Sequence, residues 1–95
     1  MIIKLSPVRS DKQLVLAVSG DTLLINGTPL DFSPLPEGAV IPATATGSSW
    51  LTEDVKRVNG VIQLTVMLPH AEGASEAVRF PQPLTAGDGP VELPK

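Results

Sequence analysis

The sequence contains no cysteine and no tyrosine, and its only aromatic residues are Phe32, Trp50 and Phe80. Without cysteine there is no disulfide framework, no thiolate metal site and no cysteine nucleophile. One histidine, His70, falls short of the three protein ligands that a catalytic zinc needs, so we expect no metal and no cofactor. No stretch approaches the roughly 20 apolar residues that span a bilayer, and we expect no membrane contact.

Positive charge is also scarce. The 95 residues carry 7 Lys+Arg against 10 Asp+Glu, a formal net charge of -3, and the one adjacent basic pair, Lys56-Arg57, follows two acidic residues. Such a chain is a poor electrostatic match for a phosphate backbone, and we expect no nucleic-acid binding. The N-terminus lacks the basic and then long apolar regions of a signal peptide, which predicts a cytoplasmic location.

Short aliphatic runs separated by turn residues dominate what is present. Leu14, Leu16 and Val18 alternate at period two, as in a half-buried strand. Asn26-Gly27 and Asn59-Gly60 each lie between two such runs and predict type I′ hairpin turns. No helix of normal length is expected. The predicted strands are residues 13–19, 22–25, 28–32, 39–41, 50–58, 61–68 and 77–80.

These elements predict one all-β domain over residues 1–90, with a loose C-terminal tail at 91–95. We expect six or seven short, mostly antiparallel strands in a sandwich-like or open-barrel arrangement. Pro69 is expected to end its strand, and residues 33–49 and 70–76 to be loops. The predicted core is Ile3, Leu5, Leu14, Leu16, Val18, Leu23, Ile25, Phe32, Trp50, Val58, Ile62, Leu64, Val66 and Phe80.

The candidates for catalysis are weak. His70 could work with Ser75 or a nearby carboxylate in a hydrolase, but a lone histidine in a Gly/Ala-rich loop is more often a surface residue. Glu53 and Asp54 are neighbours on a predicted strand and would point to opposite faces. No glycine spacing matches a phosphate-binding loop. We therefore expect that the protein is not an enzyme.

The candidates for binding are apolar positions on the outward faces of the predicted strands. Val15 lies on the outer face of one strand, and Val61 and Met67 lie on the outer face of another. Trp50 follows the long loop, where a tryptophan caps a small core or anchors a partner. The predicted partner surface is Trp50, Val15, Val61 and Met67. In the alternative interpretation, Trp50 and the 33–49 loop line a site for a small ligand or glycan.

Several strings carry a family resemblance that spans nearly the whole chain, and residues 31–38 are the most distinctive part. The strings are MIIKLSPVR at 1–9, GDTLLING at 20–27, DFSPLPEG at 31–38, VNGVIQLTVMLP at 58–69 and DGPVELP at 88–94. Together they resemble small uncharacterised proteins of bacterial prophages that are encoded among tail and tail-fibre genes. No catalytic or ligand residues follow from this resemblance.

The resemblance implies a non-enzymatic phage or prophage accessory protein, either a minor tail component or an assembly factor for tail or tail-fibre proteins. Its expected partners are phage structural or tail proteins, with self-association as a homo-oligomer as a further option. Its expected location is the cytoplasm of the bacterial host, with association with the virion in addition. A glycan-binding module is the competing expectation, and an enzyme built on His70 is the weakest.

Overall fold

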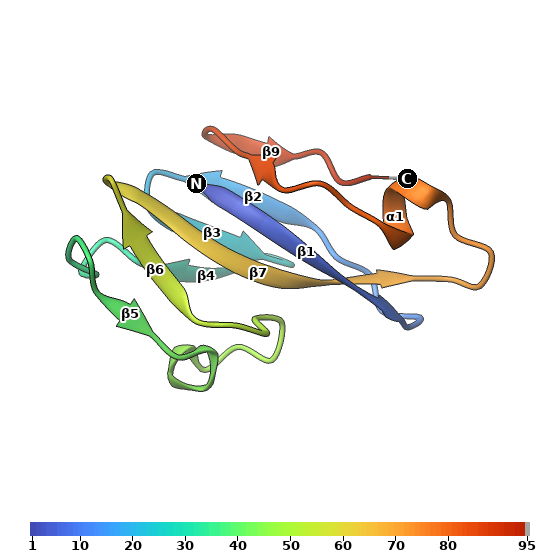
Figure 1. The fold of residues 1–95 in the computed structure, drawn as a ribbon, viewed down its shortest axis with the longest axis horizontal. Helices are drawn as coiled ribbons and strands as arrows, with labels where there is room; N and C mark the ends of the chain where they lie inside the picture. The colour runs from blue at the N-terminus through green and yellow to red at the C-terminus, as the bar shows by residue number, and fades with distance from the viewer. Residues whose placement is uncertain (95) are drawn as a thin grey trace.

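The computed structural model describes residues 1–94, which form an all-β domain of two sheets with one helical turn and one 3-10 turn (Figure 1). The elements are β1 (Ile2–Arg9), β2 (Leu16–Ser19), β3 (Thr22–Ile25), β4 (Thr28–Asp31), β5 (Val40–Ile41), η1 (Ala43–Thr46), β6 (Val55–Val58), β7 (Val61–His70), α1 (Glu76–Arg79), β8 (Leu84–Thr85) and β9 (Gly89–Val91). The predicted all-β class is confirmed.

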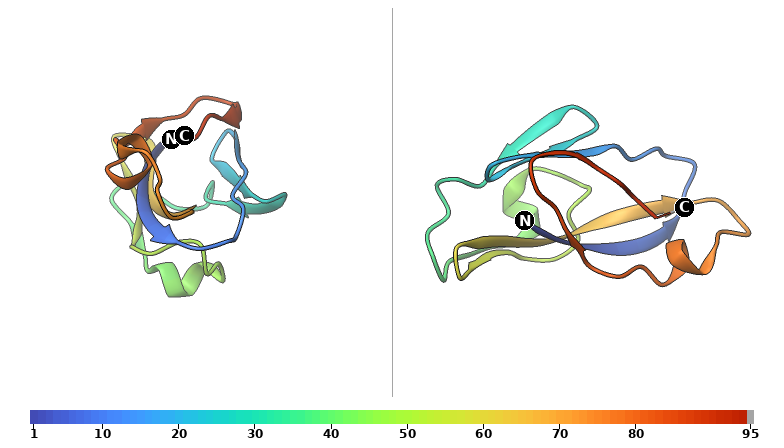
Figure 2. Two further views of the ribbon diagram at one scale, coloured as in Figure 1. Left: turned by 90° about the vertical axis from the view of Figure 1, so that its right-hand side faces the viewer. Right: turned by 90° about the horizontal axis from the view of Figure 1, so that it is seen from above.

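The two sheets differ in their number of strands and in the direction of one strand pair. The five-stranded sheet has the order β5-β6-β7-β1-β8, and the four-stranded sheet has the order β4-β3-β2-β9. Within these sheets β1 and β7 pair in parallel, from Ile2 opposite Gln63 to Arg9 opposite His70, and the other strand pairs are antiparallel. Figure 2 shows that the sheets face one another. The expected sandwich-like arrangement of mostly antiparallel strands is confirmed.

Two Asn-Gly pairs form the tight hairpins, as predicted. Asn26 and Gly27 have φ values of 51° and 84° and join β3 to β4, while Asn59 and Gly60 have φ values of 52° and 78° and join β6 to β7. A type I′ turn needs positive φ at both central residues, and Asn and Gly tolerate that conformation best.

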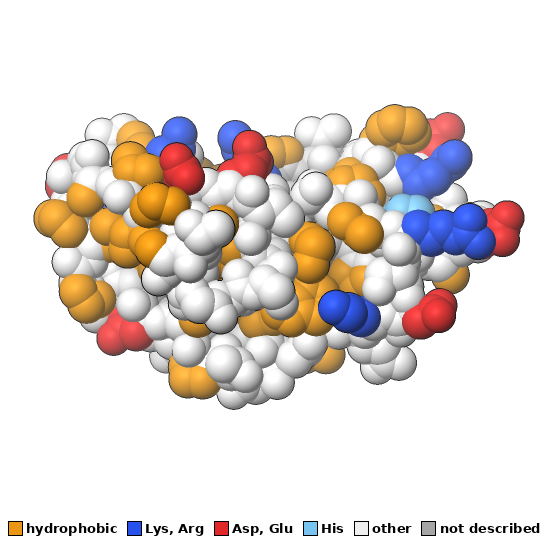
Figure 3. Space-filling view, turned by 90° about the horizontal axis from the view of Figure 1, so that it is seen from below, with side chains coloured by type: hydrophobic (Ala, Val, Ile, Leu, Met, Phe, Trp, Pro, Cys, Tyr) orange, Lys and Arg blue, Asp and Glu red, His pale blue; other side chains and the backbone are white. Residues whose placement is uncertain are grey.

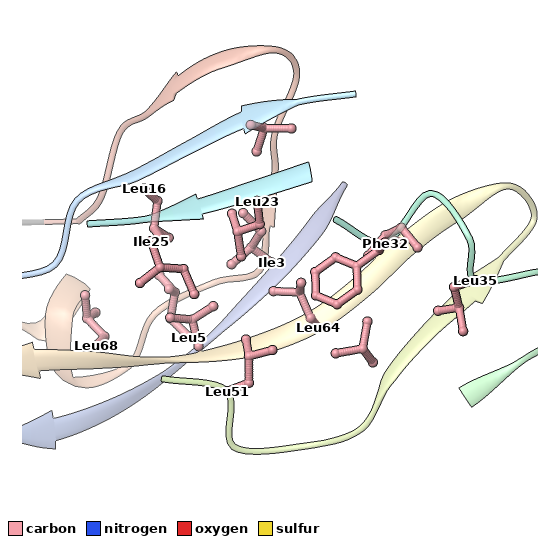
Figure 4. Close-up of a cluster of buried hydrophobic side chains, with 14 of the residues drawn as sticks. Ile3, Leu5, Leu16, Leu23, Ile25, Phe32, Leu35, Leu51, Leu64 and Leu68 are labelled. Atoms are coloured by element: carbon pink, nitrogen blue, oxygen red, sulfur yellow. The ribbon is translucent and has the colours of Figure 1, made fainter. Parts of the chain in front are cut away.

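The core lies between the sheets, and its largest contribution comes from alternate residues of β7 (Figure 4). Burying these faces on both sheets is the main favourable term for a domain of this size. Leu35, Leu51, Val55, Leu68 and Val78 are core residues that the predicted set omits. The buried hydrophobic residues are Ile3, Leu5, Leu16, Val18, Leu23, Ile25, Phe32, Leu35, Leu51, Val55, Ile62, Leu64, Val66, Leu68 and Val78.

The expectation that Pro69 ends its strand is wrong, because β7 continues to His70. Backbone groups of alternate strand residues point to opposite edges. The Met67 N–H donates to the Trp50 carbonyl on one edge, and the His70 carbonyl accepts from the Ser10 N–H on the β1 edge. Pro69 shares the edge of Met67, beyond the point where residues 50–52 pair with β7, so its missing N–H removes no ladder hydrogen bond.

The predicted strand at 77–80 is also wrong, because Glu76–Arg79 forms α1. An acidic residue in the first turn and a basic residue in the last turn favour a helical turn over an isolated strand. Val78 is buried and attaches α1 to the core. Phe80, predicted to be in the core, is 72% exposed.

The predicted strand at 50–58 is shorter in the structure. Only Val55–Val58 forms β6, while Leu51 makes an isolated antiparallel bridge with Val66 of β7. Val58, predicted to be buried, is 37% exposed because it lies on the outer face of its sheet, opposite Val61. Leu14 and Trp50 are partly buried against the core.

The end of the chain contributes to both sheets. β8 pairs with β1, and β9 pairs with β2 through Leu16 and Val91. Leu93 packs in part against the core. Of the tail expected to be loose at 91–95, Val91 is thus the last residue of β9, and Lys95 lies outside the described residues.

Candidate functional site

A pocket of about 250 Å³ lies beside Trp50, between the end of the 33–49 loop and the β3–β4 hairpin. Residues 33–49 cross from β4 to β6 and contain β5 and η1. The pocket therefore joins segments of the two sheets. Its lining is Ile25, Asn26, Thr28, Leu30, Gly47, Ser48, Ser49 and Trp50.

Local hydrogen bonds fix Trp50 on the loop side of the pocket. The Trp50 N–H donates to Ser48 Oγ at 3.2 Å, and the Trp50 carbonyl accepts from the Met67 N–H at 2.8 Å. The Lys12 ammonium lies 5.9 Å from the centroid of the indole ring, within the range of a cation–π contact. Trp50 is thus held by its own loop and by β7, with its ring partly exposed.

Asn26 fixes the hairpin side of the pocket. Its Oδ1 accepts from the Val15 N–H at 2.7 Å, and its Nδ2 donates to the Gln13 carbonyl at 3.0 Å. The Val15 carbonyl in turn accepts from the Asn26 N–H at 2.8 Å. These bonds place Val15, which is 65% exposed, next to the turn that borders the pocket.

The lining of the Trp50 pocket is uncharged. It combines one aromatic ring and two aliphatic side chains with the hydroxyls of Thr28, Ser48 and Ser49. The loop that carries η1 lies at the bottom of Figure 1, and Figure 3 views that side, where charged side chains lie mostly along the rim and right-hand half. The volume is just under the roughly 300–1,000 Å³ of ligand pockets, which limits an occupant to about one small ring.

The outer face of the five-stranded sheet is a second candidate surface. Val8, Val40 and Val58 are exposed there by 37%, 54% and 37%, and Val61 and Met67 are half-buried. These side chains share a face because strand residues alternate and paired residues point the same way. We call Val8, Val40, Val58, Val61 and Met67 the valine face.

A polar hollow of about 330 Å³ interrupts the valine face. Lys4 of β1 and Lys56 of β6 line this hollow, together with Glu53 and Asp54 from the segment before β6. The Thr65 hydroxyl, buried on this face, donates to Glu53 Oε2 at 2.9 Å. The hollow therefore separates the Val61 end of the face from the Met67 end.

The structure brings some of the predicted partner residues together and separates others. Trp50 and Met67 are joined by a backbone hydrogen bond at one edge of β7. Val15 adjoins the Trp50 pocket through Asn26, whereas Val61 lies at the start of β7, beside Val58. The four residues thus fall on two surfaces, the Trp50 pocket and the valine face.

The catalytic candidates are dispersed. His70 ends β7, with its Nδ1 3.0 Å from the Ala71 carbonyl oxygen, and Ser75 begins α1. Glu72 pairs with Arg9 at 3.0 Å between two largely exposed side chains. Within residues 1–94 no group of three or more His, Asp or Glu side chains could hold a metal ion. Over the same residues, no helix is long and apolar enough to cross a membrane.

Sequence reasoning missed Arg57, whose side chain is only 13% exposed. Its Nη2 donates to Asp21 Oδ2 at 2.9 Å and to the Phe32 carbonyl at 3.1 Å, and its Nε donates to the Leu35 carbonyl at 2.6 Å. Arg57 thus connects β6 to the segment that leaves the four-stranded sheet. Its spacing of two residues from buried Val55 was the available signal, because such spacing places both side chains on the inner face.

Comparison of the chain with protein-family models, with curated proteins and with solved structures found no match.

Proposed function

We propose that this chain is a non-enzymatic accessory protein of a phage or prophage, either a minor tail component or an assembly factor for tail or tail-fibre proteins. It acts through protein–protein contacts in the cytoplasm of the bacterial host and, in the first case, in the virion. The proposal combines the resemblance of the sequence to prophage proteins with one structural observation, the exposed apolar side chains of the valine face.

The valine face supports a protein partner for two reasons. Its three most exposed members are large hydrophobic residues in a chain that exposes few others, and grouped apolar exposure is typical of interaction sites. In addition, Lys4 and Lys56 flank the polar hollow without an ion pair among the described residues. A partner with apolar side chains around a polar centre would complement this arrangement.

The first test is mass spectrometry of virions purified after induction of a host that carries the gene. Detection of the chain in the particle supports a minor tail component. Absence from the particle together with abundance in the lysate supports an assembly factor, and affinity capture should then recover a tail or tail-fibre protein. Absence from the particle with no tail protein captured contradicts the proposal.

A paired substitution tests whether the valine face carries the contact. Val40→Glu and Val58→Glu should each remove most of the captured tail protein, because each buries a charge in an apolar contact. Val15→Glu is the matched control, since Val15 is a valine outside the valine face that is still more exposed, at 65%. Equal capture by all three variants would exclude the valine face as the contact.

A second candidate function, binding of a small neutral glycan, rests on the Trp50 pocket. Sugars combine apolar ring faces with hydroxyls, and the pocket offers an indole beside three hydroxyl side chains, with the Lys12 ammonium 5.9 Å from the centroid of the indole ring. Trp50 is the only tryptophan, so its fluorescence reports directly on the pocket. A glycan panel should change this fluorescence in wild type and less in Thr28→Ala, with Thr85→Ala on β8 as the control. A flat titration removes this candidate.

A further inference from the structure

Phe80 is the most exposed of the large hydrophobic residues that the structure describes, at 72%. It follows α1, whose buried Val78 attaches the turn to the core, so Phe80 projects from a fixed support. The guanidinium carbon of Arg79 lies 5.8 Å from the centroid of the phenyl ring. Aromatic residues and arginine are among the residue types enriched at protein interfaces.

A groove of about 520 Å³ lies next to this ring. Phe80, Ala77 and Leu84 contribute from the α1–β8 segment, and Leu93 and Pro94 contribute from the segment after β9. Figure 1 shows the C-terminal segment running beside α1. The groove is the most apolar of the hollows described above, and Phe80 is both a projection from the surface and part of the groove wall.

Two side chains of opposite charge lie at or next to this groove. Arg79, the last residue of α1, lies against the Phe80 ring next to the groove, and Glu92 lines the wall formed by the C-terminal segment. Neither residue takes part in the ion pairs of residues 1–94, which are Arg9–Glu72 and Arg57–Asp21. One surface therefore presents a projecting ring, a groove for a ring, an unpaired cation and an unpaired anion.

We propose that this surface binds a second copy of the chain in a two-fold symmetric dimer. A two-fold contact joins the same patch on both subunits, so a patch that contains both members of each complementary pair fits its own copy. Phe80 of each subunit would enter the groove of the other, and Arg79 would face the partner's Glu92, twice in the dimer. The contact uses neither the valine face nor the Trp50 pocket, so a dimer leaves both available.

The test is sedimentation equilibrium of the purified protein over a concentration series. Wild type should show a monomer–dimer equilibrium, and Phe80→Ala should raise the dissociation constant at least about tenfold, as loss of a central aromatic anchor does. Val40→Ala is the matched control, because it removes an exposed apolar side chain on the valine face, which contributes nothing to the groove lining. Phe80 is exposed, so its variant should keep the wild-type circular dichroism, and the two thermal midpoints should agree at concentrations low enough for both proteins to be monomeric.

Charge reversal distinguishes the two-fold contact from nonspecific apolar association. Arg79→Glu and Glu92→Arg should each weaken the dimer, and the double variant should recover it to within about threefold of wild type. A wild-type chain that stays monomeric at every concentration overturns the proposal. A dimer whose dissociation constant is unchanged by Phe80→Ala also overturns it. The same holds if the double variant dimerises more weakly than both single variants, or if the chain is a monomer whose groove binds a different protein. Dimerisation of the pure chain is measured independently of the virion assay, so the two proposals can fail separately.

Discussion

The two Asn-Gly hairpins have nearly the same backbone and different supports. Their asparagines have φ values of 51° and 52°, and each turn joins two antiparallel strands. In the β3–β4 hairpin the Asn26 side chain itself bonds to Gln13 and Val15. In the β6–β7 hairpin the Glu37 carboxylate accepts the backbone N–H groups of Asn59 and Gly60, at 2.8 and 2.6 Å.

This difference shows that a turn motif determines local geometry without determining what holds the turn in the fold. The β3–β4 hairpin is attached by Asn26, a residue of the turn itself, whose side-chain partners lie 11 and 13 residues away. The β6–β7 hairpin is attached by Glu37, which lies 22 residues before Asn59, and by Arg57. Arg57 bonds to the nearby Gly60 carbonyl and to partners that lie 22 to 36 residues away. We therefore expect the second hairpin to be more sensitive to changes outside its own turn.

The largest effect is expected from Arg57→Met, which should lower the free energy of unfolding by about 2–3 kcal/mol. The change leaves the Asp21 carboxylate and the carbonyls of Phe32 and Leu35 without their donor while keeping a side chain of similar length. Urea denaturation measures the loss. Arg57→Lys should recover only part of it, because lysine lacks the planar fork that reaches several acceptors.

Lys56→Met is the matched control for Arg57, since Lys56 is the exposed neighbour on the same strand. It should change the free energy of unfolding by less than about 0.5 kcal/mol. Equal losses at the two positions would show that Arg57 is an ordinary surface cation and that the β6–β7 hairpin needs no distant support.

A pair of asparagine substitutions tests the first hairpin against the second. Asn26→Ala should lower the free energy of unfolding by about 1 kcal/mol more than Asn59→Ala does. Of these two asparagines, only Asn26 makes side-chain hydrogen bonds to other described residues. The cost of placing alanine at positive φ cancels in this comparison, since both residues have nearly the same φ. Thermal or urea unfolding measures the difference, and equal losses would contradict the assignment of support to the Asn26 side chain.

The Glu37 carboxylate is the counterpart support for the second hairpin. Glu37→Gln keeps one acceptor oxygen and removes the charge, so we expect a loss of about 1 kcal/mol or less for this exposed group. Amide hydrogen exchange gives a local measurement: exchange should accelerate at Asn59 and Gly60 while Asn26 keeps its wild-type rate. Unchanged exchange at both hairpins would mean that the carboxylate adds nothing to the turn.

The same contrast explains which features the sequence predicted. The Asn-Gly turns and the alternation of Ile62, Leu64 and Val66 depend on a few neighbouring residues, and both were predicted correctly. The parallel pairing of β1 with β7 joins residues about 60 positions apart, and no local pattern specifies it. At 77–80, apolar content suggested a strand, but the charges at either end of a short turn favoured α1.

The candidate sites also divide into features that neighbouring residues specify and features that depend on contacts between distant segments. Trp50 was picked out because the chain has a single tryptophan, and the 33–49 loop because of its length. The contribution of the β3–β4 hairpin to the Trp50 pocket depends on how the two sheets pack, which the sequence does not express locally. Phe80 was assigned to the core by its hydrophobicity alone, whereas its position one residue after α1 places it outside.

The smallest effect concerns Asp31, the carboxylate at the end of the first hairpin. The Ser33 backbone N–H donates to Asp31 Oδ1 at 2.9 Å, and this bond, with the hydroxyls of Ser33 and Thr22, lowers the pKa of Asp31 below its ordinary value. Because the folded pKa is the lower one, the carboxylate contributes its full stabilisation above the ordinary aspartate pKa. That contribution is lost as the pH falls through the folded value.

An NMR titration of the Asp31 carboxyl carbon should show this lowered pKa directly. Ser33→Ala should move the pKa only part of the way back, because the backbone N–H, the larger cause, remains. Asp31→Asn should lower stability at neutral pH, where the carboxylate contributes fully, and should flatten the fall in stability as the pH drops below about 4. An Asp31 that titrates at its ordinary value would mean that the first hairpin takes no support from its terminal carboxylate. The two hairpins would then differ in their acidic groups as well as in their asparagines, because Glu37 bonds to the β6–β7 turn while Asp31 would give the β3–β4 hairpin no support.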